Sequence, residues 1–287
     1  KTGRVLDIGC GKGLFLKYFL DAHPDWELFA VEPSLNAGEY FSKVMPMVNL
    51  YNGSFEDSPY SEEEFDLVIA SGVLEHVPNP IQFMQIFKNC LGKKGVGYIG
   101  VPNFTNNPAD LFTFDHLSRF TPATVEALFK VIGSTITSRY IPEESVPMWF
   151  LIKNNDPGNI NLNHLYQESQ SLADRAIDYI DSMFESYSRC AAKAGEDGGK
   201  IGMYGMGAIG FLGTQYTNLA LEKITAIFDD NETMWGSKKN GIKVYAPREM
   251  PMLDIKHVIL SANPCYLNTI KGKIFKHCDS NINIYGK

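Results

Sequence analysis

The fold of the first half of the chain is decided by one stretch, Val5-Leu6-Asp7-Ile8-Gly9-Cys10-Gly11-Lys12-Gly13. In it an apolar, strand-like run leads into a loop with glycine at alternate positions, and a stretch with helical periodicity follows. Glycine is needed where a backbone turns sharply and approaches a ligand without a Cβ in the way. A second strand-like run ends at Glu32, about twenty residues after Gly13, the distance at which a carboxylate reaches the ribose hydroxyls of a bound nucleotide. The sequence therefore predicts a nucleotide-type βαβ unit here.

Strand-like and helix-like stretches continue to alternate through the first half, as in a parallel sheet covered by helices. The expected strands are 4–8, 27–31, 47–51, 65–70 and 96–101. The expected helices are 13–21, 35–44, 80–90 and 122–132. Two further β-rich runs, 135–141 and 147–153, are predicted to close the sheet as an antiparallel hairpin. These runs together predict a seven-stranded α/β sheet.

The second half begins with a long helix and continues as another α/β unit. Apolar residues recur at three- and four-residue steps from 162 to 194, which predicts one amphipathic helix that packs between domains or between subunits. The strands expected after it are 201–204, 224–228, 242–245, 257–261 and 282–285, and the helices are 208–221 and 267–275. The predicted organisation is a first domain at 1–156, a long helical linker at 157–197 and a smaller Rossmann-like domain at 198–287.

Composition limits the partners and the compartment. The chain has 26 lysine and arginine residues against 33 acidic residues, a net charge of −7, which argues against a phosphate-backbone partner. We therefore expect no nucleic acid. No apolar run reaches the length of a membrane span and no secretory signal is visible, so we expect no membrane partner and a cytoplasmic location. The 5 cysteines are dispersed, which predicts neither a disulfide framework nor a metal site.

Several motifs that follow the glycine loop in order resemble those of the class I S-adenosylmethionine-dependent methyltransferases. They are Glu32 after the second strand, residues 53–59 after the third, the fourth strand with Ser71 at its end, and Leu74-Glu75-His76-Val77. A phosphate-binding P-loop is excluded because Lys12 is followed by Gly13 and not by serine or threonine. The resemblance implies a Rossmann-like methyltransferase domain with S-adenosylmethionine as its cofactor.

The same resemblance implies which residues contact the cofactor. They are Asp7, Gly9, Cys10, Gly11, Gly13, Glu32, Pro33, Ser54, Phe55, Ser71 and His76. In this assignment the glycines line the methionine and ribose part, and Asp7 orders the loop and meets the amino-acid end. Glu32 accepts hydrogen bonds from the ribose hydroxyls. Ser54 and the Phe55 backbone lie against adenine, and Ser71 and His76 lie beside the sulfonium.

Catalysis is expected at a histidine. Methyl transfer is an in-line displacement, so much of the catalysis is alignment and desolvation. A nucleophile that must lose a proton also needs a base near neutral pH. His116, beside Asp115, lies in a loop that resembles the segment supplying the base in sugar C-methyltransferases. We expect His116, with His76 and Asp115, to be catalytic; the alternative is that His116 only packs the loop or caps a helix. The remaining histidines are expected to be surface or structural: His23, His164, His257 and His277.

A second glycine-rich loop, Gly205-Met206-Gly207-Ala208-Ile209-Gly210, opens a helix, and Asp229 follows about twenty residues later. By spacing alone this is a dinucleotide pattern, so binding of NAD(P) stays open. The segment also resembles the C-terminal domain of sugar C-methyltransferases, which implies a substrate-binding role for Gly205, Gly207, Asp229 and Asn263. Glycines that serve only helix–strand packing are a third alternative.

The sequence thus predicts a two-domain methyltransferase that acts on a small polar metabolite, most simply a nucleotide-linked sugar methylated at carbon or oxygen. Two alternatives remain. One is a bifunctional protein whose C-terminal domain binds NAD(P). The other is a non-catalytic scaffold that binds the cofactor or a partner. A homodimer through the 162–194 helix is a further expectation.

Overall fold

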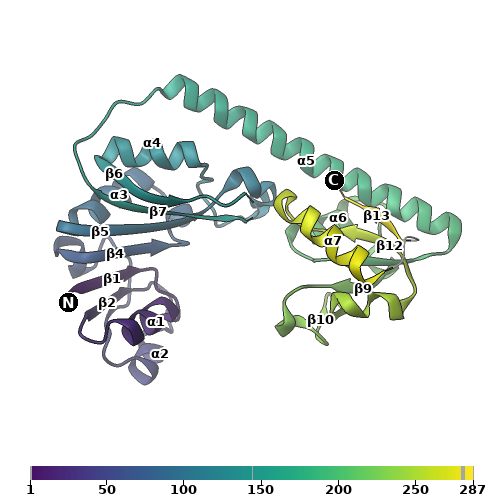
Figure 1. Cartoon of the computed structure of the whole chain (residues 1–287), viewed down its shortest axis with the longest axis horizontal. Helices are drawn as coiled ribbons and strands as arrows, with labels where there is room; N and C mark the ends of the chain where they lie inside the picture. Colours follow the sequence, from purple (N-terminus) through teal and green to yellow (C-terminus); the bar gives the residue numbers. More distant parts are fainter. Residues whose placement is uncertain (1, 144, 279–281, 287) are drawn as a thin grey trace. The chain divides into compact units, whose positions relative to one another are not determined.

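The structure is a computed structural model that describes residues 2–143, 145–278 and 282–286 (Figure 1). The chain divides into two compact units. The first contains residues up to 104 together with 115–142 and 146–166, and the second is made chiefly of residues from 167 onward together with 105–114. Residues 105–114 belong to the second unit because Ala109 and Phe112 pack against its apolar core.

The first unit is built on a seven-stranded sheet with the strand order β3-β2-β1-β4-β5-β7-β6. Its strands are β1 Arg4–Ile8, β2 Glu27–Val31, β3 Asn49–Tyr51, β4 Phe65–Ser71, β5 Leu91–Pro102, β6 Ser134–Tyr140 and β7 Pro147–Asn154. Strands β1 to β5 are parallel, whereas β7 runs antiparallel to both β5 and β6. The predicted α/β fold with a closing hairpin is therefore confirmed.

Helices cover this sheet where the sequence places apolar faces. They are α1 Leu14–Ala22, α2 Ala37–Val44, α3 Pro80–Asn89 and α4 Pro122–Ile132, and a short 3-10 turn, η2, spans Leu74–His76. Helix α4 has the predicted bounds because Thr121 and Thr124 form a capping box at its start and Gly133 adopts the left-handed conformation at its end. The apolar side chains of α3 and α4 pack in one buried cluster with β4, β5 and β7.

The second unit has a six-stranded sheet with the order β10-β11-β9-β8-β12-β13. Its strands are β8 Lys200–Tyr204, β9 Ile224–Phe228, β10 Lys238–Lys239, β11 Ile242–Tyr245, β12 Ile255–Leu260 and β13 Asn283–Tyr285, and its helices after the long one are α6 Ala208–Tyr216 and α7 Leu267–His277. Helix α6 ends earlier than the predicted 208–221, because Thr217 leaves the helical conformation and its hydroxyl donates to the Gly213 carbonyl at 2.6 Å.

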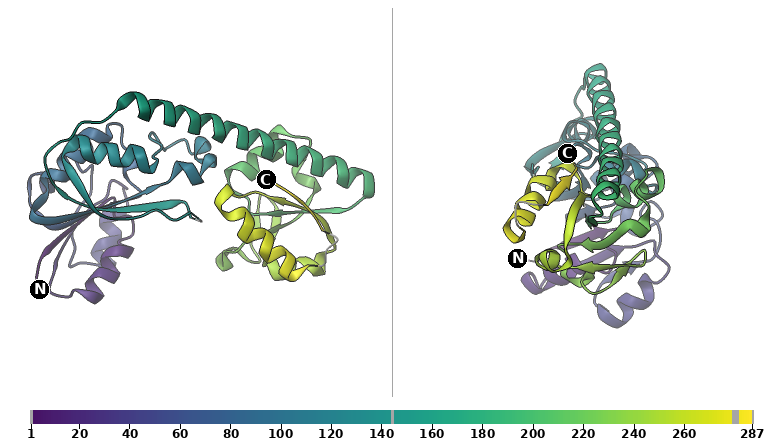
Figure 2. Two further views of the ribbon diagram at one scale, coloured as in Figure 1. Left: turned by 45° about the horizontal axis from the view of Figure 1, so that its top comes forward. Right: turned by 90° about the vertical axis from the view of Figure 1, so that its right-hand side faces the viewer.

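Helix α5, Leu162–Asp197, has 36 residues. Figure 2 shows it as one continuous helix. Its buried residues begin at Leu172, while Leu162 and Tyr166 near its start are exposed. Residues from Met183 on enter the apolar core of the second unit. The helix is therefore more than the predicted linker, because from residue 167 onward it belongs to the second unit. No helix in the described ranges combines the length and the apolar character that crossing a membrane requires.

Candidate active site

The loop between β1 and α1 has the backbone conformation that its glycines predict. Gly9, Gly11 and Gly13 all have positive φ, at 68°, 55° and 66°. A Cβ at Gly9 would lie 2.5 Å from a Val73 methyl, and one at Gly13 would lie 2.7 Å from the Phe41 ring. A Cβ at Gly11 would meet no described atom within 4 Å. Packing therefore requires the outer two glycines, while Gly11 borders open space.

Glu32, which directly follows β2, ties this loop to the neighbouring strand. Its side chain is buried, at 8% exposure. One carboxylate oxygen accepts from the Gly11 amide at 2.8 Å, and the other accepts from the Ser34 amide at 2.9 Å. Because a carboxylate offers about four acceptor positions, both oxygens retain capacity for the hydroxyls of a ligand.

Asp7, near the end of β1, is the second buried acid at this place, with 5% exposure. Burial, and then the charge of Glu32, raise the pKa of its carboxyl group from 3.8 to about 7. A positively charged ligand nearby would favour the ionised carboxylate. Cys10 is half-buried, and burial raises the pKa of its thiol, so it is no thiolate nucleophile.

A cleft of about 460 Å³ opens beside this loop, a size in the range of small-molecule sites. The predicted cofactor residues that line it are Gly9, Glu32, Pro33, Ser54, Phe55 and His76. The Ser54 hydroxyl donates to Asp57 at 2.7 Å. The Phe55 side chain packs on Phe83. Ser71 lies elsewhere, at the end of β4, where its hydroxyl is close to Gly100. The structure thus brings these six predicted cofactor residues to one cleft, whereas five others are outside its described lining: Asp7, Cys10, Gly11, Gly13 and Ser71.

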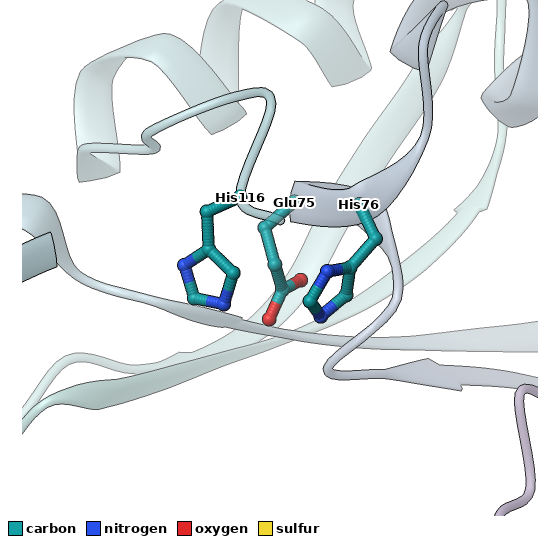
Figure 3. Close-up of side chains that lie close together, drawn as sticks. All are labelled: Glu75, His76 and His116. Atoms are coloured by element: carbon teal, nitrogen blue, oxygen red, sulfur yellow. The ribbon is translucent and has the colours of Figure 1, made fainter. Parts of the chain in front are cut away.

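Beside the cleft, Glu75, His76 and His116 form a cluster whose side-chain donor atoms all lie within 4.8 Å of one another. Figure 3 shows the Glu75 carboxylate between the two imidazole rings. The rings meet edge to face, with centroids 4.8 Å apart. Glu75 is buried, at 3% exposure, whereas His76 is exposed on the side of the cleft.

Backbone hydrogen bonds bring the cluster together from distant segments. The amides of Leu117 and Ser118 both donate to the Glu75 carbonyl, at 2.7 and 3.1 Å, so the loop after His116 is held against η2. Nδ1 of His76 lies 2.9 Å from the Asp115 carbonyl oxygen and 3.5 Å from its carboxylate. Asp115 therefore faces His76, and the acid that shares the cluster with His116 is Glu75. Sequence reasoning missed Glu75, although its place beside His76 was the available signal.

The other histidines lie away from this cluster. His23, His164 and His277 are exposed. His257 is fully buried in the second unit, where Nε2 lies 3.0 Å from Asp197 and Nδ1 lies 3.2 Å from the Tyr285 hydroxyl. Its position between two fixed partners indicates a structural role.

The residues predicted to bind substrate in the second unit do not all meet at one place. Gly205 and Asp229 line one crevice. Gly207 and Asn263 are absent from its described lining; Gly207 is exposed before α6, and Asn263 precedes the short turn Pro264–Tyr266.

Comparison with known proteins locates the family resemblance in the first half of the chain. Residues 1–139 match the family model described as a methyltransferase domain. Among curated proteins, the tRNA U34 carboxymethyltransferase of Pseudomonas fluorescens is 34% identical over 100 residues, which are 33% of this chain and 31% of that protein. The protein of the same name from Azotobacter vinelandii is 32% identical over 100 residues, 32% of this chain and 30% of its own length. The chain thus spans about a third of the length of the curated relatives it matches.

Among solved structures, that of the plantazolicin methyltransferase BpumL, in complex with a monoazolic desmethylPZN analog and SAH, is 20% identical to this chain. The match covers 54% of this chain and 77% of that one, with a TM-score of 0.46.

The expectation that excluded nucleic acid from the partners is wrong, because relatives that match this chain are named for a tRNA. It rested on the net charge of −7. Net charge sums over the whole molecule and does not report how basic groups are arranged on one surface. An acidic total is therefore no ground for excluding a nucleic acid.

Proposed function

Because residues 1–139 form an S-adenosylmethionine-dependent methyltransferase domain of class I, we propose that this chain methylates an acceptor that contains a nucleotide. The observation that carries the proposal is the cleft beside the glycine loop, with the Glu75–His76–His116 cluster at its side.

The residues in the cleft and in the adjoining glycine loop fit an adenosyl sulfonium. Gly11 leaves open space where any other residue would place a Cβ, and Glu32 holds that glycine through its amide while keeping acceptor capacity for ribose hydroxyls. Asp7 adds a buried acid that a cationic ligand would ionise. When bound, S-adenosylmethionine supplies an electrophilic methyl group. The contribution of the chain is to bind, to align and to exclude water.

The histidine cluster supports proton removal from the acceptor. His76 lines the cleft, and its Nδ1 faces the Asp115 carbonyl. An Nδ1–H donated to that carbonyl leaves Nε2 as the acceptor. The buried carboxylate of Glu75 lies between the two rings and would stabilise the imidazolium of whichever histidine takes the proton. We propose that His116 and His76 together supply the base, with His76 as the ring that lines the cleft and with Glu75 and Asp115 as orienting acids.

Two acceptor classes follow from different observations. A nucleotide-linked sugar is supported by the second glycine loop and by Asp229, which follows a parallel strand as in nucleotide-binding folds. A tRNA is supported by the names of the matched relatives. Both acceptors contain nucleosides, so a nucleoside-binding site would suit either of them. They differ in size, and an experiment must distinguish them on that basis.

The test is transfer of an isotopically labelled methyl group from S-adenosylmethionine to two acceptor panels, sugar nucleotides and unmodified bulk tRNA. Label in one panel identifies the acceptor class, and label in neither rejects the proposed acceptor. His116→Ala should lower turnover by about 10²–10⁴-fold, the range for loss of a general base, with the affinity for S-adenosylhomocysteine unchanged. The matched control is His164→Ala, which removes an exposed histidine of α5. Full turnover in the His116 variant would reject its role as the base.

A further inference from the structure

The second unit has a crevice of its own at the point where its strand order reverses. Strands β9 and β12 lie on opposite sides of β8, and all three are parallel. In open sheets of this kind, ligands bind outside the carboxyl ends of the strands at such a switch point. A crevice of about 310 Å³ opens here, between the strand ends and α7, and all of its lining residues belong to the second unit.

Gly205 shapes one wall of the crevice. It directly follows β8 with φ at 74°, and its amide donates to the Phe228 carbonyl at 2.7 Å. A Cβ at this position would lie 2.8 Å from the carbonyl oxygen of Ser261, just after β12. The turn is thus tied to one neighbouring strand and lies against the end of the other, and only glycine fits this close approach.

The charges around the crevice favour hydroxyl groups over phosphates. Lys273 is the one cation among the lining residues that the structure describes, and its Nζ lies 2.8 Å from the Asp230 carboxylate. Asp230 also accepts from the Tyr204 hydroxyl at 2.9 Å. Since Asp230 already neutralises Lys273, the negative charge of Asp229 has no counter-charge among the described lining residues. A phosphate inside the crevice would meet this net negative charge without a free cation.

Asp229 is placed to accept hydrogen bonds from a ligand. It directly follows β9 and is half-buried. Its Oδ1 accepts from the Asn231 amide at 2.9 Å, which fixes the direction of the side chain. An acid in this place, after the second strand of a parallel nucleotide-type unit, is suited to the vicinal hydroxyls of a ribose.

The volume limits the ligand to about one nucleoside. About 310 Å³ is at the lower end of the range for small-molecule sites. A dinucleotide or a stretch of nucleic acid would not fit inside. Ala262, Tyr266 and Ile270 give the crevice an apolar side, and an aromatic ring is a suitable surface for a planar base.

We propose that this crevice binds one ribonucleoside group, with the ribose hydroxyls on the Asp229 carboxylate, the base on the side of Tyr266, and any phosphate outside. The further statement that this nucleoside belongs to the methyl acceptor rests on the proposed function. Binding of the nucleoside does not rest on it, because the crevice and the cofactor cleft share no residue.

The experiment titrates uridine, cytidine, guanosine and adenosine into the whole chain by ligand-observed NMR, with S-adenosylhomocysteine in excess to fill the first cleft. We expect at least one ribonucleoside to bind and its 2′-deoxy counterpart to bind at least about tenfold more weakly. Asp229→Asn keeps the shape of the side chain and its hydrogen bond with the Asn231 amide. It should weaken the binding of the ribonucleoside by a similar factor. Glu222→Gln, an exposed acid of the same unit, is the matched control and should change nothing.

Three results would overturn the proposal: no binding of any of the four ribonucleosides up to about 10 mM, equal affinities for a ribonucleoside and its 2′-deoxy counterpart, or equal affinities in the Asp229 variant and the control. The comparison of ribose with deoxyribose uses the unaltered chain, so it decides even where Asp229→Asn fails to fold. Affinity for S-adenosylhomocysteine is measured in the same samples. If the unaltered chain does not bind S-adenosylhomocysteine, the proposed function is rejected, but the result for the nucleoside remains valid.

Discussion

Asp7 carries a buried carboxyl group whose ionisation the fold opposes. Burial and the charge of Glu32 raise its pKa from 3.8 to about 7, so between these values the native state holds a proton that the unfolded state releases. The free energy of unfolding should therefore fall as the pH rises through this window. We expect about 2–3 kcal/mol less stability from this group at pH 8 than at pH 5. Asp7→Asn should remove that part of the pH dependence.

Urea unfolding of both proteins at pH 5 and pH 8, without cofactor, measures this difference. Asp21→Asn is the control, because Asp21 is an exposed acid of α1. A pH dependence that is the same in all three proteins would contradict the assignment to Asp7.

The charged residues of the cleft proposed to bind the cofactor also bear on the group that is transferred. The matched relatives are named carboxymethyltransferases, but the ionisable groups among the described lining residues are Glu32, Glu56 and His76, without lysine or arginine. A sulfonium that carried a carboxymethyl group would bring an additional carboxylate into this acidic cleft. We expect such a donor to bind at least about tenfold more weakly than S-adenosylmethionine in calorimetric titrations at pH 8.

Glu56→Gln should reduce the difference in affinity between the two donors, because it removes one of the negative charges that repel the carboxymethyl group. Ser42→Ala, a change on the exposed surface of α2, should leave the ratio unchanged. Equal affinities for the two donors in the unaltered chain would show that the acidic lining does not select the transferred group.

Between elements, the packing of α5 on α6 depends on one glycine. A Cβ at Gly213 of α6 would lie 1.9 Å from the ring of Tyr187. Tyr187 belongs to α5 and is completely buried. Gly213→Ala should therefore destabilise the second unit by about 1–3 kcal/mol, the cost of overpacking. Gly195→Ala is the matched control, because Gly195 also lies in a helix but a Cβ there meets no described atom within 4 Å. It should stabilise by about 0.5–1 kcal/mol. Thermal unfolding measures the stability change in both variants. Equal changes would contradict the close contact between Gly213 and Tyr187.

Most helices and strands could be predicted from the sequence, because apolar periodicity and caps such as Thr121 are local signals. The positive φ of Gly9, Gly11 and Gly13 follows in the same way from a glycine loop after a strand. The pairing within the histidine cluster could not be predicted. It depends on the Leu117 and Ser118 amides meeting the carbonyl of Glu75, more than forty residues earlier in the chain, and no local pattern encodes that contact.

For the whole molecule, the division into two units with separate cores predicts two unfolding transitions. The cleft proposed to bind the cofactor is lined by residues of the first unit alone. S-adenosylhomocysteine at about 100 times its dissociation constant should therefore stabilise that unit by about 2.7 kcal/mol and leave the other transition in place. Scanning calorimetry with and without the ligand measures both transitions. Glu32→Gln should reduce the shift, since the carboxylate that holds Gly11 is lost. A single transition that the ligand shifts as a whole would contradict this prediction.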